Sequence, residues 1–117
     1  MRLVRELEKR GSEESFQVEE QVWLDRNGVM LDCSRNSVLT MDMIKWYIRF
    51  EASLGMNTMM LYTEDTYEVE EYPYFGAYRG RYSSGELRER AEYADLFGIE
   101  MIPCIQALAH LKNTLRW

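Results

Sequence analysis

The segment N-T-M-M-L-Y-T-E-D-T-Y-E (residues 57–68) decides how the chain folds. Its first part, residues 58–62, is a continuous run of apolar and β-prone side chains, and two adjacent carboxylates, Glu64 and Asp65, follow it. An apolar run between a glycine and a polar cluster is typical of a strand buried on both faces. Ligands of parallel α/β sheets bind beyond the carboxyl ends of the strands, so Glu64 and Asp65 are candidate site residues. A solvated acidic loop is the alternative that these residue types leave open.

This pattern of an apolar run with a polar end occurs three times, near residues 29–32, 58–63 and 99–105. Helical spacing of apolar residues fills the intervals, at residues 40–54 and 83–97. Strands that alternate with helices indicate βαβ units and a parallel sheet, so the sequence predicts an α/β fold.

Local signals set the ends of these elements. Thr40 is a helix N-cap and Gly55 is a C-cap, while S-S-G-E (83–86) is a capping box. Pro103 cannot donate to a strand ladder, which favours an edge or irregular position for the third strand. The first of the two helices is expected to bury one stripe, made of Ile44, Tyr47, Ile48 and Leu54 and widened by Trp46 and Phe50.

The chain before these units is more polar. Residues 2–10 have helical spacing, and residues 16–24 alternate in part, as in an edge strand or an extended lead-in. We expect residues 1–21 to be the end of a preceding small α/β domain or a linker, and residues 22–117 to contain the βα units.

Composition limits the classes of function. The formal net charge of −6 disfavours nucleic acid and anionic membranes as partners, and no apolar stretch approaches the length of a membrane span. Cys33 and Cys104 lie far apart, which favours reduced thiols in a cytoplasmic protein. His110 is the single histidine, which excludes a multi-histidine metal centre. We expect no metal site and no cofactor.

Three parallel strands cannot close a barrel, which needs roughly 250 residues. We therefore expect the chain to be a piece of a larger protein. Alone, it would expose sheet edges and one apolar face, and would pair with the rest of a barrel or with itself. A compact monomer in gel filtration would contradict this expectation.

The three strand ends bring polar residues of several kinds to one rim. Asp32 and Arg35 follow the first strand, Glu64 and Asp65 the second, and His110 the third, with Gln106 beside it. An arginine, carboxylates and an imidazole at one rim suit a hydroxyl-rich ligand. Arg35 as a loop salt-bridge partner and His110 as a structural histidine remain open alternatives. Adjacent carboxylates in a strand point to opposite sides, so a bend is needed for both to face a ligand.

Residues 66–82 form a long, aromatic-rich loop, T-Y-E-V-E-E-Y-P-Y-F-G-A-Y-R-G-R-Y. Loops of this length in compact domains are usually functional or disordered, and the aromatic content argues against disorder. The loop could stack on a ligand or cover the rim of a barrel.

Four motifs together resemble family 20 glycoside hydrolases, and most of all a bacterial subgroup of β-N-acetylhexosaminidases. The motifs are G-V-M-L-D-C-S-R-N (28–36), L-G-M-N-T-M-M-L-Y-T-E-D-T-Y-E (54–68), P-Y-F-G-A-Y-R-G-R-Y-S (73–83) and G-I-E-M-I-P-C-I-Q-A-L-A-H-L (98–111). The resemblance implies a partial (β/α)8 TIM barrel, with about three parallel strands and flanking helices. It implies a substrate that is a glycan ending in β-linked N-acetylhexosamine (GlcNAc or GalNAc).

The resemblance also implies roles for individual residues. Arg35 matches the arginine that binds hydroxyls of the terminal sugar, with Glu64 and Asp32 beside it as substrate-binding candidates. Asp65, or less favourably Glu64, and His110 match residues that support the general acid. The family hydrolyses with retention, using the acetamido group of the substrate as nucleophile. Its Asp-Glu pair follows a fourth strand, so these 117 residues alone are expected to be inactive.

Two other functional classes stay open from the residues themselves. The first is a non-catalytic carbohydrate-binding or interaction module that uses Arg35 and the aromatic loop without chemistry. The second is a small flavodoxin-like domain, which would need more strands than the sequence offers.

Overall fold

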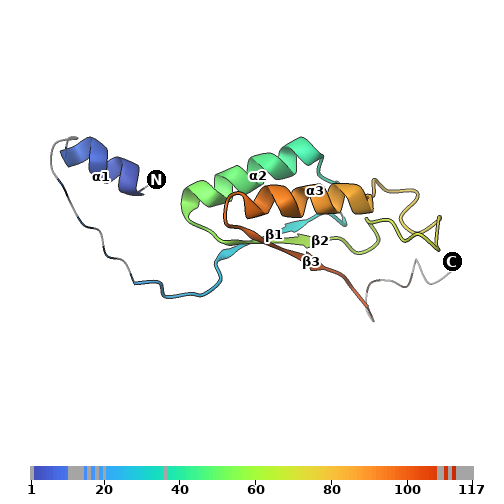
Figure 1. Cartoon of the computed structure of the whole chain (residues 1–117). Coiled ribbons are helices and arrows are strands. Elements are labelled where there is room, and N and C mark those ends of the chain that lie inside the picture. The colour runs from blue at the N-terminus through green and yellow to red at the C-terminus, as the bar shows by residue number, and fades with distance from the viewer. Residues whose placement is uncertain are drawn as a thin grey trace.

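The chain folds as a three-stranded parallel sheet with helices on one face (Figure 1). The computed structural model describes residues 2–10, 15, 17, 19, 21–35, 37–107, 110 and 112. The elements in chain order are α1 (Arg2–Arg10), β1 (Gly28–Asp32), α2 (Met41–Leu54), β2 (Thr58–Tyr62), α3 (Ser84–Asp95) and β3 (Glu100–Cys104). The predicted alternation of strands and helices is therefore confirmed.

The strands run in the order β1-β2-β3 and pair without offset. Gly28 lies opposite Thr58, which lies opposite Glu100, and the register continues to the row that ends the three strands, Asp32, Tyr62 and Cys104. Because the register is even, the loops that follow the three strands leave the sheet at the same edge. Pro103 lies on β3 at the end of this order, which confirms its expected edge position.

Helix α2 begins and ends at the residues that the sequence indicated, and α3 begins at its predicted cap. Helix α3 ends at Asp95, with Leu96 at its C-cap, which is earlier than the predicted end at residue 97. The Thr40 side chain accepts a hydrogen bond from the Met43 amide, and Gly55 ends α2 in the left-handed region at φ 79°. At α3, Ser83 and Glu86 form the complete capping box, in which each side chain accepts from the other's backbone amide. These caps satisfy backbone groups that the helix itself leaves without partners.

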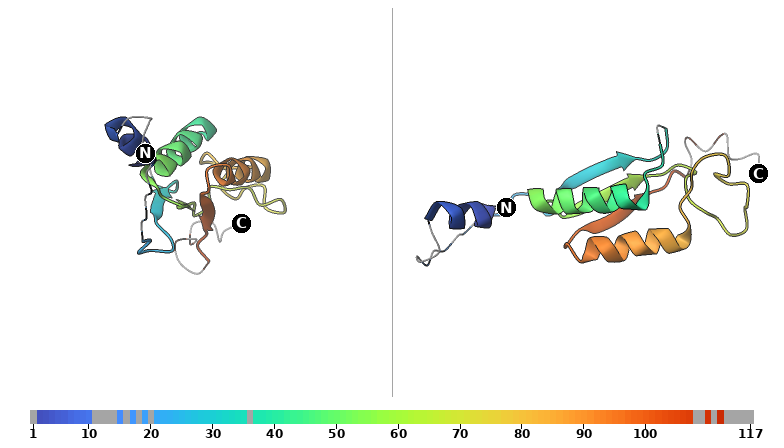
Figure 2. Two further views of the ribbon diagram at one scale, coloured as in Figure 1. Left: turned by 60° about the vertical axis from the view of Figure 1, so that its left-hand side comes forward. Right: turned by 90° about the horizontal axis from the view of Figure 1, so that it is seen from above.

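Helices α2 and α3 lie together over one face of the sheet (Figures 1 and 2). The buried core forms between them and the strands, and it contains Cys33, Ile44, Ile48, Met59, Leu61, Tyr82, Ala94 and Ile99. The opposite face carries Met30, Met60 and Ile102 in one row across the strands, and the Met30 side chain is 53% exposed. In the part of the chain that the structure describes, helices cover only the first face.

The expected stripe on α2 is narrower than its sequence suggested. Ile44 and Ile48 are fully buried, but Trp46, Phe50 and Leu54 are about half exposed. The Trp46 and Phe50 rings stack on each other, with centroids 5.2 Å apart, on the side away from the core. The prediction that they widen the buried stripe is therefore wrong within this chain, because the three-stranded sheet offers no partner on that side.

The segment before β1 lies outside the sheet. Helix α1 lies at one end of the molecule, with Val4 and Leu7 exposed (Figure 1). Residues 15, 17, 19 and 21–24 are not in a strand, so an extended lead-in describes them better than an edge strand. Phe16 and Val18 lie outside the described residues, as does most of the segment after residue 107. None of the described helices has the length and apolar character that crossing a membrane requires.

Candidate active site

The candidate site lies where the loops after β1, β2 and β3 meet. Its centre is the carboxylate of Glu64. The Glu64 side chain is only 11% exposed. Glu64 Oε1 lies 3.6 Å from Arg35 Nη2 and 3.7 Å from His110 Nδ1. The structure therefore brings together three of the residues that the sequence predicted, one from each strand end.

Arg35 and His110 also contact each other directly. Arg35 Nη2 lies 3.0 Å from His110 Nδ1. The guanidinium can only donate, so Nδ1 accepts this hydrogen bond, and the proton of the neutral ring then resides on Nε2. In this arrangement Nε2–H is the group through which the His110 ring can donate a hydrogen bond.

The backbone turns sharply at Glu64 and so provides the bend that adjacent carboxylates need if both are to face a ligand. Strand β2 ends at Tyr62, and Glu64 has φ 48°, in the left-handed region. The Glu64 amide donates to the side-chain oxygen of Gln106, 3.1 Å away, which ties the turn to the end of β3. Because of this turn, Glu64 and Asp65 do not point to opposite sides as they would in a strand.

Asp65 is held by a residue that the sequence analysis did not select. Arg79, from the aromatic-rich loop, donates from Nη1 to Asp65 Oδ1 at 2.9 Å, and the same Nη1 lies 3.8 Å from Glu64 Oε2. The one signal in the sequence was a cation within a loop next to two carboxylates, which is too common to select a residue. Burial and the charge of Asp65 together raise the pKa of the nearby Tyr67.

Asp32 has a local role in the loop after β1. Its Oδ1 accepts from the Ser34 amide at 2.8 Å and from the Ser34 hydroxyl at 2.6 Å. These hydrogen bonds, first of all that from the Ser34 side chain, lower the pKa of Asp32. The carboxylate thus shapes the backbone that leads to Arg35.

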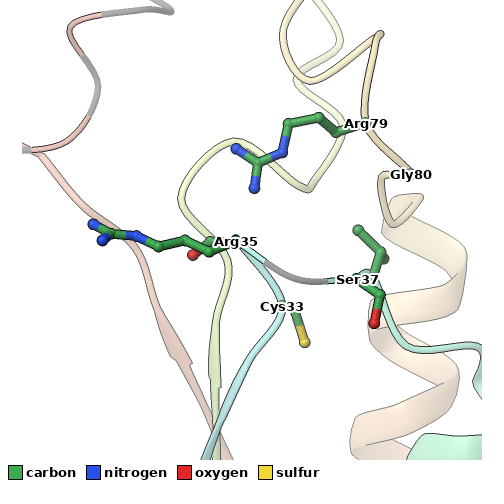
Figure 3. Close-up of a pocket in the computed structure, with 7 residues that line it drawn as sticks. Cys33, Arg35, Ser37, Arg79 and Gly80 are labelled. Atoms are coloured by element: carbon green, nitrogen blue, oxygen red, sulfur yellow. The ribbon is translucent and has the colours of Figure 1, made fainter.

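A hollow of about 170 Å³ lies beside the group formed by Glu64, Arg35 and His110. It is lined by Cys33, Ser34, Arg35, Ser37, Val38, Arg79 and Gly80. Figure 3 shows Arg35 and Arg79 reaching from two different loops on one side of it, while the Cys33 thiol points away from both. The loop after β1 and the aromatic-rich loop therefore form this part of the rim together.

The aromatic side chains of residues 66–82 divide between the interior and the surface. Tyr82 is buried, and its hydroxyl donates to the Leu39 carbonyl at 3.0 Å. Tyr67 packs edge-on against Phe75, with ring centroids 5.1 Å apart. Tyr72, Tyr74 and Tyr78 are exposed. The loop thus packs over the carboxyl ends of the strands and still presents aromatic rings outward.

The described residues offer no cluster of three or more His, Cys, Asp or Glu side chains that could hold a metal ion. The site itself offers ionic and hydrogen-bonding groups: a guanidinium, an imidazole and a shielded carboxylate within 4 Å of one another. Such a group can bind hydroxyls and stabilise charge.

Comparison with known proteins points to one family. No protein-family model matches the chain. The chain is 31% identical over 102 residues to the probable beta-hexosaminidase fdl of Drosophila melanogaster, covering 77% of this chain and 15% of the relative. It is thus similar to a short part of that protein.

Solved structures match the same part. The beta-N-acetylhexosaminidase from Bacteroides fragilis superposes with a TM-score of 0.71 and 27% identity, covering 80% of this chain and 22% of that one. A glycoside hydrolase family 20 beta-N-acetylglucosaminidase gives a TM-score of 0.61 and 28% identity, over 68% of this chain and 19% of that chain. The chain therefore spans about a fifth or less of the length of these relatives.

Proposed function

This chain matches one part of the catalytic barrel of family 20 β-N-acetylhexosaminidases, and from that premise we infer its function. We propose that it supplies part of the substrate-binding rim of such an enzyme. The reaction is removal of terminal β-linked GlcNAc or GalNAc by substrate-assisted, retaining hydrolysis. The observation that carries the proposal is the shielded Glu64 carboxylate, which lies within 4 Å of Arg35, Arg79 and His110.

Arg35 is the group that binds sugar hydroxyls in this proposal. Its side chain is 60% exposed, so it can reach a ligand while it also contacts Glu64 and His110. A guanidinium offers several donors in a fixed plane, which suits vicinal hydroxyls.

His110 and a carboxylate of the strand-two pair support the general acid. The expectation from the family resemblance favours Asp65, whereas the distances favour Glu64. Glu64 lies 3.7 Å from His110, and its buried Oε1 has no hydrogen-bond partner in the described part of the chain. Asp65 is already paired with Arg79. We therefore propose that Glu64 faces the ligand and Asp65 anchors the loop.

The residues that complete the reaction are a proton donor and an aspartate that orients the acetamido group, and in the family they follow a fourth strand. We propose that the 117 residues alone bind N-acetylhexosamine weakly and do not hydrolyse it. A chromogenic N-acetyl-β-glucosaminide should show no turnover above the buffer rate, and measurable turnover would refute this part.

Binding is tested with GlcNAc itself, by NMR titration of the 117-residue chain. We expect the signals of Arg35 and His110 to shift, and Arg35→Ala to weaken binding at least tenfold, since a charge-assisted contact is lost. Arg88→Ala, on the exposed side of α3, is the matched control and should leave the affinity unchanged. Equal affinities of wild type and Arg35→Ala would remove Arg35 from the site.

Reading the source DNA beyond the codon for Trp117 separates the enzyme from a sugar-binding module. An open frame with a further apolar strand and an Asp-Glu pair supports the hydrolase. If the whole reading frame lacks that pair and the encoded protein still binds GlcNAc, the result supports the sugar-binding module.

A further inference from the structure

We infer that Arg79 is a positioning residue, which sets the strand-two carboxylates so that Glu64 faces Arg35 and His110. The inference rests on the proposed function and adds to it a residue from a loop that carries none of the groups assigned so far. The observation that supports the inference is that the Arg79 guanidinium contacts two adjacent, shielded carboxylates, those of Glu64 and Asp65.

The first step is electrostatic. The side chains of Glu64 and Asp65 are only 11% and 14% exposed, and they belong to adjacent residues. Two like charges that are close together and shielded from water oppose each other's ionisation. Arg79 Nη1, at 2.9 Å from Asp65 and 3.8 Å from Glu64, is the one cation that contacts both in the described structure. The positive charge of Arg79 therefore offsets the repulsion between the two side chains.

The second step concerns the backbone. Glu64 holds a positive φ of 48°, a backbone conformation that is unfavourable for a residue with a side chain. The ion pair of Asp65 with Arg79 holds the residue that follows this turn, and so compensates for its strain. Within the described residues, Arg79 is the ion-pair partner of the Asp65 carboxylate.

The third step concerns how firmly Arg79 itself is held. Its loop closes on itself, because Arg81 Nη1 donates to the carbonyls of Pro73 and Phe75 at 2.9 and 2.8 Å. The loop also lies directly on the turn, since a Cβ at Gly76 would come within 2.0 Å of the Asp65 carbonyl oxygen. Arg79 thus reaches Asp65 from a rigid base, and its side chain is 38% exposed beside Arg35 at the hollow (Figure 3).

The test uses NMR spectra of the 117-residue chain with isotope-labelled carboxylates. In Arg79→Gln, we expect the side-chain signals of Glu64 and Asp65 to move, and those of Arg35 and His110 to move with them. Arg79→Lys, which keeps the charge, should restore a good part of the wild-type spectrum. Arg88→Gln is the matched control. Unmoved Glu64 and His110 signals in a folded Arg79→Gln chain would overturn the inference.

A double-mutant cycle separates positioning from general support of the loop. If Arg79 acts through Asp65, then Asp65→Asn and Arg79→Gln should each weaken GlcNAc binding about fivefold, and the double variant should lose little more. If the affinity loss of the double variant equalled the product of the two single losses, Arg79 would act independently of Asp65, and the inference would be refuted.

The outcomes for the two proposals can be told apart. Absence of GlcNAc binding in the wild-type chain would count against the proposed function, while the carboxylate signals would still decide whether Arg79 sets Glu64. Normal GlcNAc binding with unmoved carboxylate signals in Arg79→Gln would refute Arg79 alone.

Discussion

Glu51 should make the chain less stable as the pH rises, and Glu51→Met should remove this effect. Glu51 lies on the face of α2 that packs on the sheet, together with Ile44 and Ile48, and its side chain is 1% exposed. Neither carboxylate oxygen has a hydrogen-bond partner within the described residues. Burial without a partner raises the pKa of Glu51 from 4.5 to about 7.

The sign of the effect follows from these two pKa values. The folded state holds the proton more tightly than the unfolded state, so folding is favoured at low pH and loses free energy as the pH rises from 4.5 toward 7. Each pKa unit corresponds to about 1.4 kcal/mol, so the full loss is about 3 kcal/mol. Between about pH 5.5 and about pH 8.5 the linkage amounts to about 2 kcal/mol.

Urea unfolding followed by circular dichroism measures this loss. The difference in the free energy of unfolding between Glu51→Met and wild type should grow by about 2 kcal/mol from about pH 5.5 to about pH 8.5. Glu92→Gln, at an exposed position of α3, is the matched control and should follow the wild type. The reasoning would be refuted if the difference in free energy of unfolding between the two chains did not change with pH. It would also be refuted if the wild type were more stable than Glu51→Met at the higher pH.

Three further substitutions test the packing around the site. Ser83→Ala removes the capping box of α3 and should lower the free energy of unfolding by about 1 kcal/mol in urea; a change within measurement error would contradict the capping role. Gly76→Ala should destabilise the chain by more than Gly85→Ala, because Gly76 has φ 66° and no room for a Cβ, and a differential-scanning melt compares the two. Arg90→Met should leave stability unchanged or raise it, because the fully buried guanidinium has two Nη atoms without a hydrogen-bond partner. A lower thermal midpoint for Arg90→Met would mean that its stacking on the Tyr82 ring, 3.4 Å away, outweighs the buried charge.

The sequence predicted the elements and their order because their signals are local. The apolar run at residues 58–62, the cap at Thr40 and the box at Ser83 each depend on neighbours along the chain, and the structure confirms all three. The parallel arrangement also followed, since a helix between two strands brings the second strand back in the same direction. With it came the expectation that Arg35, Glu64 and His110 meet at one rim.

Two features of the packing needed the tertiary structure. The outward position of Trp46 and Phe50 depends on which neighbours α2 has, and helical spacing alone cannot say this. Arg79 reaches Asp65 across 14 residues, because the aromatic-rich loop folds back onto the turn that follows β2.

The division between the two carboxylates shows the physical reason most clearly. The sequence by itself determined that Glu64 and Asp65 follow a buried strand at the edge where ligands bind, since that depends on the pattern of apolar and polar residues. Which carboxylate faces Arg35 and His110 depends on the positive φ of Glu64 and on a cation from a distant loop. Both arise only when separate segments pack together, so only the tertiary structure decided it.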